Sequence, residues 1–377
     1  MDFLPYVRHH ITAKDIAEVT RVLAGGWLTQ GPEGAAFERD LAVAVGAETA
    51  VACSSGTAAL HLAMMAKGVK PGDRVITTPL TFCATANAIR FCGGEVCFAD
   101  VDPVTLNINP KVVDEILTCY DPKPVGILAM HYGGRPCDMK ALREVADRHH
   151  VWLVEDACHA MGAQYEDGSP VGSKYADLSC WSFHATKHVA AGEGGAVTSP
   201  DGQHLIDLHN LRDHGRNYDG LMQQLGYNYR MSDINAALAR SQLKRLEANV
   251  KRLQELAEAY DAHLPATSPD CRPEPDEYDR FAWHLYPIQV EKRDELQEFL
   301  LDKGIGTQVH YRPVYLHPCY QGLGPGYFSN EITFSCPVAE KAWGRLLSLP
   351  LFASMQDADV TRVCEAIGEF YKAGSGQ

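Results

Sequence analysis

Seven short apolar segments between residues 50 and 199 constrain the fold of this chain most strongly. They alternate with stretches of helical periodicity, and most of them are apolar on both faces. The segments span residues 50–55, 74–79, 95–101, 125–131, 151–157, 178–184 and 194–199. Strands of this kind are typical of a buried parallel sheet that is covered by helices on both sides. The sequence therefore predicts an α/β fold built on a large, seven-stranded and mostly parallel sheet.

The chain on either side of these segments predicts helices and a smaller unit. Residues 14–24 have the pattern of a short helix with Thr12 as its N-cap and with Ile16, Val22 and Leu23 on one face. Apolar residues from position 232 to position 264 are spaced as in one long helix, which is weakened at Gln242. Beyond it, the predicted elements are a proline-rich loop (265–279), strands at 283–290 and 307–311, and helices at 294–304 and 358–374.

The length of 377 residues favours two domains. We expect a large domain at 1–250, with an N-terminal arm, and a small C-terminal α+β domain at 251–377.

Charge and cysteine usage exclude several classes of protein. The formal net charge of −14 argues against a nucleic-acid or membrane surface, because both partners require a cationic field. No apolar leader and no run of 18 apolar residues is present, so no membrane span is expected. The twelve cysteines are scattered without a CxxC pair. They predict reduced thiols in a cytoplasmic protein, with neither a disulfide framework nor a metal site.

Polar motifs stand where predicted strands end, which is where ligands gather in open α/β sheets. Residues 54–57 combine serines, a glycine and a threonine before a helix, which suits a phosphate or simply caps the helix. Glu155 and Asp156 end another strand. A buried carboxylate requires a partner, and both a cationic ring nitrogen and a structural ion pair satisfy that requirement.

A single lysine, Lys187, follows the strand at 178–184 and precedes the glycine-rich segment 192–195. A lysine that is partly desolvated there can bond covalently to an aldehyde, although most lysines are solvated surface charges. Phe82, just after the strand at 74–79, is either a neighbour for a ring face or a core aromatic. An anion cradle, a carboxylate, a ring neighbour and a lysine are together what pyridoxal phosphate needs.

Four ordered motifs resemble those of the DegT/StrS-type sugar-nucleotide aminotransferases. They are SSGTAALHLAMMA, EDACHA, SFHATKHVAAGEGG and GYNYRMSDINAALARSQLKRL. The resemblance extends from residue 25 to residue 315. It implies the aspartate aminotransferase fold (fold type I of pyridoxal-phosphate enzymes) and a homodimer whose active sites lie at the subunit interface.

The resemblance also implies roles for individual residues. Lys187 matches the Schiff-base lysine, and Asp156 matches the carboxylate that pairs with the pyridinium nitrogen. The other cofactor positions are His159 near the ring hydroxyl, Phe82 on the ring face, Gly56, Thr57 and Ser182 at the phosphate, and Asn228 at the phosphate of the neighbouring subunit's cofactor. The positions around the nucleotide sugar are Thr29, Gln30, Arg230, His310 and Tyr311.

The implied reaction is ping-pong transfer of an amino group from L-glutamate to a keto sugar, with Lys187 as general base and acid. His184 either assists this chemistry or packs in the loop. The SFHxxK motif is similar to two groups. One aminates a UDP-linked 4-keto-6-deoxy-N-acetylhexosamine for pseudaminic acid. The other makes UDP-4-amino-4-deoxy-L-arabinose and tends to have tryptophan at the position of Phe82, which favours the first group.

Three other hypotheses fit the sequence less well. A related sugar dehydratase has histidine in place of the lysine, and only a shift of one residue would align His188 with it. A regulator that binds the cofactor without chemistry would be free to lose Lys187 or Asp156, and both are present. A dinucleotide-binding protein would have a GxGxxG motif after the first strand, which this chain lacks.

Overall fold

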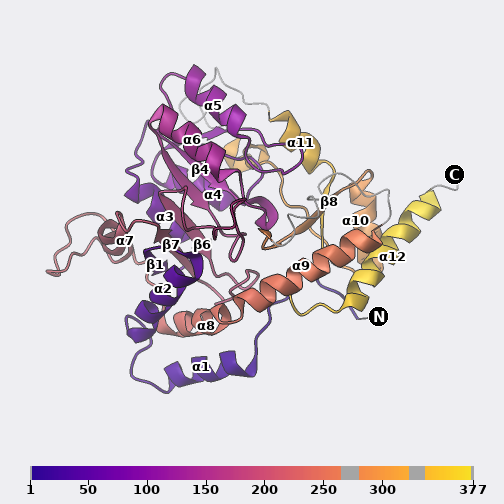
Figure 1. Ribbon diagram of the computed structural model, residues 1–377, viewed down its shortest axis with the longest axis horizontal. Helices are drawn as coiled ribbons and strands as arrows, with labels where there is room; N and C mark the ends of the chain where they lie inside the picture. Colours follow the sequence, from indigo (N-terminus) through magenta and orange to yellow (C-terminus); the bar gives the residue numbers. More distant parts are fainter. Residues whose placement is uncertain (1, 265–279, 322–335, 375–377) are drawn as a thin grey trace.

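A computed structural model describes residues 2–264, 280–321 and 336–374 (Figure 1). The predicted loop at 265–279 lies outside these residues. A seven-stranded sheet has the order β1-β7-β6-β5-β4-β2-β3. Its strands are β1 (Thr49–Cys53), β2 (Arg74–Thr77), β3 (Glu95–Phe98), β4 (Gly126–Met130), β5 (Trp152–Asp156), β6 (Leu178–Ser182) and β7 (Gly195–Ser199). β7 is antiparallel to β1 and β6, and the other neighbouring pairs are parallel. The predicted mostly parallel sheet is confirmed.

Helices cover both faces of this sheet, because its strands have apolar side chains on both sides. One face packs against α2 (Pro32–Val45), α5 (Pro110–Cys119), α6 (Met139–His149) and α8 (Asp233–Leu243). The other face packs against α3 (Gly56–Ala66), α4 (Cys83–Phe91), α7 (Leu205–Arg212) and α11 (Pro337–Trp343). The result is three layers, with the sheet between two layers of helices.

The predicted long helix is wrong in one respect, because two helices occupy its place. α8 ends at Leu243, and α9 (Leu246–His263) begins after a turn. Near this turn, the buried Gln242 side chain donates 3.0 Å hydrogen bonds to the His10 carbonyl and the Asp15 carboxylate. Arg245 adds a 2.7 Å ion pair with Asp15. Gln242, the one polar position in the apolar pattern, therefore binds the N-terminal segment, and the helix ends next to it.

The smaller unit consists of α9, α10 (Arg293–Asp302), α12 (Asp357–Gly374) and a two-stranded sheet. Its strands are β8 (Tyr286–Gln289) and β9 (Leu346–Leu349). The predicted strand at 307–311 is wrong, because that segment makes only a single bridge from Gln308 to Ser348 and then turns into the cleft described below. Short 3-10 helices are η1 (Tyr132–Gly134), η3 (Val314–Leu316) and η4 (Pro318–Tyr320).

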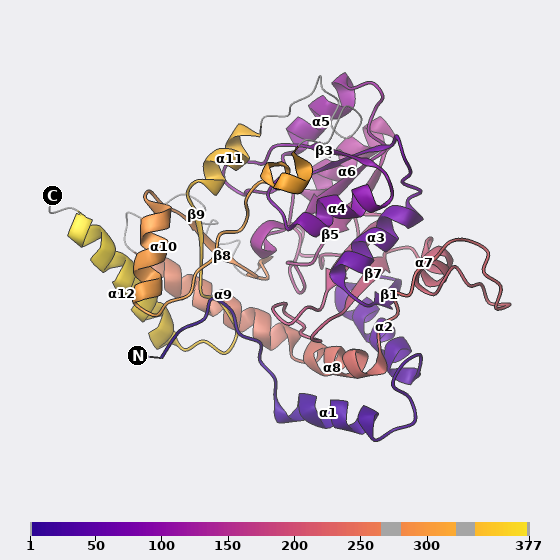
Figure 2. The ribbon, with the colours of Figure 1, turned by 180° about the vertical axis from the view of Figure 1, so that it is seen from behind.

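α9 connects the two units (Figures 1 and 2). Leu246 and Val250 belong to the core under the large sheet, whereas Leu256 and Tyr260 belong to the core of the smaller unit. The expected domain boundary at residue 250 lies inside this helix and stays a prediction. Leu4 of the N-terminal arm bridges to Ile305 and joins the smaller core.

Two segments place apolar side chains on the surface. α1 (Ala13–Leu23) has the predicted Thr12 cap, and Val22 is buried, but Ile16 and Leu23 are 60% and 57% exposed. The chain between α7 and α8 projects from the body (Figure 1), and Leu225 on it is 83% exposed. Neither apolar surface is covered by the described residues of the chain. None of the described helices is long and apolar enough to cross a membrane.

Candidate active site

A cleft of about 660 Å³ lies beyond the carboxyl ends of β5 and β6. The segment 309–312 of the smaller unit forms its other wall. Ten predicted site residues line it: Gly56, Thr57, Phe82, Asp156, His159, Ser182, His184, Lys187, His310 and Tyr311. The topology explains this convergence, because parallel strands bring the loops after their carboxyl ends to one edge of the sheet.

Lys187 stands in the loop between β6 and β7, which is pinned at both ends. The Phe183 amide donates to the Gly194 carbonyl at 2.8 Å, and the Ala191 amide donates to the Phe183 carbonyl at 2.8 Å. The amine nitrogen of Lys187 lies 3.1 Å from Nε2 of His284. Burial lowers the pKa of Lys187 from its usual value, although Cys158 and Asp156 oppose the shift. A larger uncharged fraction makes this amine a better nucleophile than a surface lysine.

Glu155 and Asp156 end β5 on opposite faces of the sheet. The Glu155 carboxylate accepts hydrogen bonds from His131, Tyr165 and Ser179 at 2.9, 2.7 and 2.5 Å, and its side chain is fully buried. Asp156 lines the cleft and accepts 2.7 Å and 3.2 Å hydrogen bonds from the Thr85 hydroxyl and the Cys158 amide.

Asp156 is only 3% exposed, and it forms no ion pair within the described parts of the chain. Because a buried anion is costly without a cation, this carboxylate is suited to a positively charged ligand in the cleft. The structural network therefore belongs to Glu155, and the role of Asp156 as a ligand partner stays a prediction.

The N-terminus of α3 closes one end of the cleft. Ser55 caps the helix by accepting a 3.1 Å hydrogen bond from the Ala58 amide. The amides of Gly56 and Thr57 lie in the first turn, where a helix offers no carbonyl partner. A Cβ atom on Gly56 would lie 2.7 Å from Cβ of Ser182, so only glycine permits this approach. Free amides, a hydroxyl and the helix dipole together favour an anion.

Imidazole and phenol groups also gather in the cleft. His159 is 2% exposed, and its Nε2 lies 3.3 Å from the Tyr311 hydroxyl. Its Nδ1 has no partner among the described residues. Burial keeps the pKa of His159 well below its usual value and lowers that of His310 to about 4. His159 therefore offers a neutral ring with one free polar atom beside the cleft.

Two further predicted residues present exposed rings to the cleft. Phe82 immediately precedes α4 and is 58% exposed, so it is not the core aromatic that the sequence also allowed. His184 is exposed, and its Nδ1 lies 3.0 Å from the Thr186 hydroxyl. That contact fixes the ring within the loop and leaves the other nitrogen free to meet a ligand.

Four predicted site residues do not line this cleft: Thr29, Gln30, Asn228 and Arg230. Isolated bridges join Thr29 to Ser232, Arg230 to Cys53 and Asn228 to Asp213, so these segments meet beside the end of β1. Arg230 forms an ion pair with Asp213. Asn228 is exposed.

Several cleft residues were missed from the sequence. They include Tyr6, Thr85, Cys158, Glu193, His284 and Arg312. His284 carried a usable signal, because it is a polar residue near the start of a mostly apolar predicted strand. Thr85 carried no signal in the sequence, because its hydrogen bond to Asp156 depends on the approach of α4 to the end of β5.

Known proteins resemble this chain along almost its whole length. Residues 9–368 match the sequence profile of the DegT/DnrJ/EryC1/StrS aminotransferase family. The spore coat polysaccharide biosynthesis protein SpsC of Bacillus subtilis (strain 168) is 40% identical over 391 residues, which cover 98% of this chain and 97% of SpsC.

Two solved structures illustrate the likeness in fold. Helicobacter pylori PseC, an aminotransferase involved in the biosynthesis of pseudoaminic acid, has a TM-score of 0.89 and 27% identity, covering 99% of this chain and 100% of PseC. Spr1654 from Streptococcus pneumoniae, in its PLP-form, has a TM-score of 0.89 and 26% identity, covering 98% of this chain and 99% of Spr1654. The predicted aminotransferase fold is thus confirmed.

Proposed function

The chain belongs to the DegT/DnrJ/EryC1/StrS aminotransferase family, and from this premise we propose that it uses pyridoxal phosphate to transfer an amino group from L-glutamate to a nucleotide-linked 4-keto sugar. One observation carries the proposal: the buried carboxylate of Asp156, which has no ion-pair partner among the described residues, faces the same cleft as the amine of the half-buried Lys187. A cationic ring that also bears an aldehyde satisfies both groups.

The remaining cleft residues fit this cofactor in chemistry. The amides of Gly56 and Thr57 and the Ser182 hydroxyl would hold its phosphate, and the free Nδ1 of His159 would meet its ring hydroxyl. Phe82 would cover a ring face. When bound, pyridoxal phosphate supplies an aldehyde and an electron-withdrawing ring.

The protein's own part in the reaction is to hold charges and move one proton. Asp156 holds a proton at the ring nitrogen, because a nearby carboxylate favours the cationic form. Lys187, once its amine is free, takes a proton from the Cα atom of the amino donor and later returns one. His184 lies in the same loop, where its exposed ring can bind substrate.

We also propose that the active enzyme is a homodimer, in which Asn228 and Arg230 serve the neighbouring subunit's cleft. Their absence from the cleft of their own chain and the exposed apolar side chains on the projecting segment support this arrangement.

Leu225→Asp should raise the dissociation constant of the dimer at least ~10-fold, because it places a charge in an apolar contact. Analytical ultracentrifugation measures this, with the exposed Leu301→Asp on α10 as a matched control. A wild-type protein that is monomeric at its working concentration and fully active would contradict the proposal.

For the sugar, we propose a UDP-linked 4-keto-6-deoxy-N-acetylhexosamine. The SFHxxK motif, Phe82 and the likeness to PseC support it. The second candidate is another nucleotide-linked keto sugar that is destined for a surface polysaccharide, and the likeness to SpsC supports that alternative. The cytoplasmic location expected from the sequence stays a prediction.

A substrate panel tests this choice. UDP-, dTDP- and GDP-linked 4-keto sugars are incubated with the protein and L-glutamate, and mass spectrometry follows the amino-sugar product. We expect kcat/KM for the UDP-linked hexosamine to exceed the others by roughly 10–200-fold, as is typical of one missing contact in a binding site. Enzyme reduced beforehand with borohydride serves as the control. A preference for dTDP or GDP sugars contradicts the choice of substrate but leaves the aminotransferase activity intact.

A further inference from the structure

His284 lies against the Lys187 amine without belonging to any of the four sequence motifs. Its Nε2 atom is 3.1 Å from Nζ of Lys187, which is within hydrogen-bonding distance. A second, smaller cavity of about 50 Å³ lies behind this pair and is lined by residues 7–10 of the N-terminal arm. Thr186, Lys187 and His284 line both this cavity and the main cleft. The lysine and the histidine are therefore part of the partition between the two spaces.

The fold holds His284 at this partition through strained backbone. Trp283 has a φ of 53°, a left-handed conformation that is unfavourable for a non-glycine residue and that concentrates at functional sites. A Cβ atom on Gly134 would lie 2.9 Å from the His284 backbone nitrogen, so glycine is needed for this approach. On the other side, Nε2 of His188 donates a 2.9 Å hydrogen bond to the Ala282 carbonyl.

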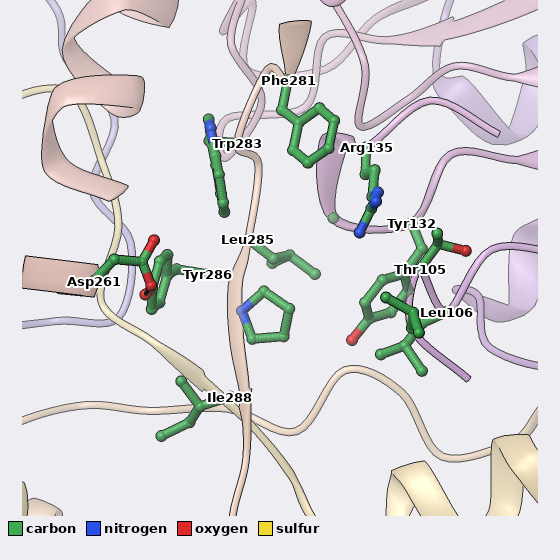
Figure 3. A pocket seen from close by; sticks show the side chains of 13 residues that line it. Thr105, Leu106, Tyr132, Arg135, Asp261, Phe281, Trp283, Leu285, Tyr286 and Ile288 are labelled. Carbon is green, nitrogen blue, oxygen red and sulfur yellow. Dashed lines mark hydrogen bonds between the residues drawn. The ribbon is translucent and has the colours of Figure 1, made fainter. Parts of the chain in front are cut away.

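The neighbours of His284 do not line the main cleft. Leu285 lines a separate small pocket with Tyr132 and Asp261 (Figure 3), and Trp283 lines that pocket as well as the smaller cavity. The alternation along this segment thus places two apolar side chains away from the cleft and one imidazole toward Lys187. A packing role alone does not require an imidazole at this position.

The surroundings keep the imidazole neutral. Burial holds the pKa of His284 well below its usual value, and the charge of Lys187 adds to this effect. Asp156 and Cys158, from the end of β5, raise the pKa of Lys187, and the charge of Lys187 in turn lowers the pKa values of His159, His188 and His310. A neutral ring with its proton on Nδ1 has a lone pair on Nε2, which can accept a hydrogen bond from the lysine.

We propose that His284 is a positioning residue for Lys187, whose Nε2 accepts a hydrogen bond from the free amine and so directs the amine's lone pair into the cleft. This inference rests on the proposed function of Lys187. The hydrogen bond holds the amine in place whenever it is not bonded to the cofactor. It also favours the ammonium form, because an acceptor binds a cationic donor more strongly than a neutral one.

The test measures Lys187 itself in the cofactor-free protein. Acetic anhydride labels its amine across a pH series, and mass spectrometry of the peptide containing Lys187 gives the midpoint of reactivity. Two substitutions of His284 by an amide residue are compared. Glutamine places its oxygen near the position of Nε2, whereas asparagine reaches only the position of Nδ1. We expect His284→Asn to move the midpoint about one pH unit lower, through loss of a charge-assisted hydrogen bond. His284→Gln should restore the wild-type midpoint.

The controls separate positioning from folding and from cofactor binding. Melting temperatures establish that each variant folds, and His263→Asn, the same substitution at an exposed histidine of α9 outside the cleft, should leave the midpoint unchanged. If His284→Asn does not fold, His188→Ala replaces it, and the midpoint should move in the same direction. Midpoints that stay at the wild-type value in the folded variants, or that move equally in both amides, overturn the proposal. Pyridoxal phosphate added separately, with borohydride trapping, reports on the function of Lys187 independently of this result.

Discussion

Replacing Lys187 by arginine is expected to lower the rate of amino transfer on the order of 10⁴-fold, the upper range for loss of a general acid–base group. Arginine keeps the length and charge of the side chain, but its guanidinium does not lose a proton in proteins and so acts neither as nucleophile nor as base. The measurement is the single-turnover rate with L-glutamate, followed through the cofactor's absorbance.

The matched control for this variant is Lys174→Arg. Lys174 is an exposed lysine that forms an ion pair with Asp167 outside the cleft, so the same substitution there should leave the rate within about twofold. A Lys187→Arg enzyme that retains wild-type turnover would show that another amine carries the chemistry.

Replacing Asp156 by asparagine is expected to lower the single-turnover rate about 10²–10⁴-fold, the kinetic equivalent of breaking a buried ion pair at about 3–5 kcal/mol. The amide is nearly isosteric: its oxygen can still accept from the Cys158 amide, and its nitrogen can donate to the Thr85 hydroxyl. It lacks the negative charge that holds a proton on the ring nitrogen. The variant should therefore fold and bind the cofactor but should react slowly.

Glu155→Gln provides the contrast, because Glu155 ends the same strand and faces away from the cleft. Removing its charge weakens the buried network with His131, Tyr165 and Ser179, at a cost of about 1–3 kcal/mol of folding stability. We expect a lower melting temperature with a nearly unchanged rate per folded enzyme. The opposite pattern, a stable but slow Glu155→Gln and a fast Asp156→Asn, would show that the two carboxylates are assigned to the wrong roles.

The sheet and most of the cleft could be predicted because both depend on local patterns. All seven apolar segments form strands, since a chain that is apolar on both faces must be covered on both faces. Asp156, Ser182 and Lys187 lie at or just beyond the carboxyl ends of their strands, so their convergence follows from topology.

Other features depend on contacts between distant segments. Nothing local distinguishes Glu155 from Asp156 until the face of β5 that each occupies is known. The break between α8 and α9 depends on Gln242 and Arg245 meeting Asp15, more than 200 residues away in sequence. The contact between Lys187 and His284 crosses 97 residues and requires the left-handed Trp283, which no propensity favours.

The most direct test of this account is chemical trapping of the cofactor on the protein. Purified protein is incubated with pyridoxal phosphate, reduced with borohydride, digested and mapped by mass spectrometry. The account predicts one phosphopyridoxyl group, attached to Lys187, and its loss in Lys187→Arg. A reduced group on a different lysine, or labelling of Lys187→Arg equal to that of the wild type, would contradict the central claim that Lys187 holds the cofactor.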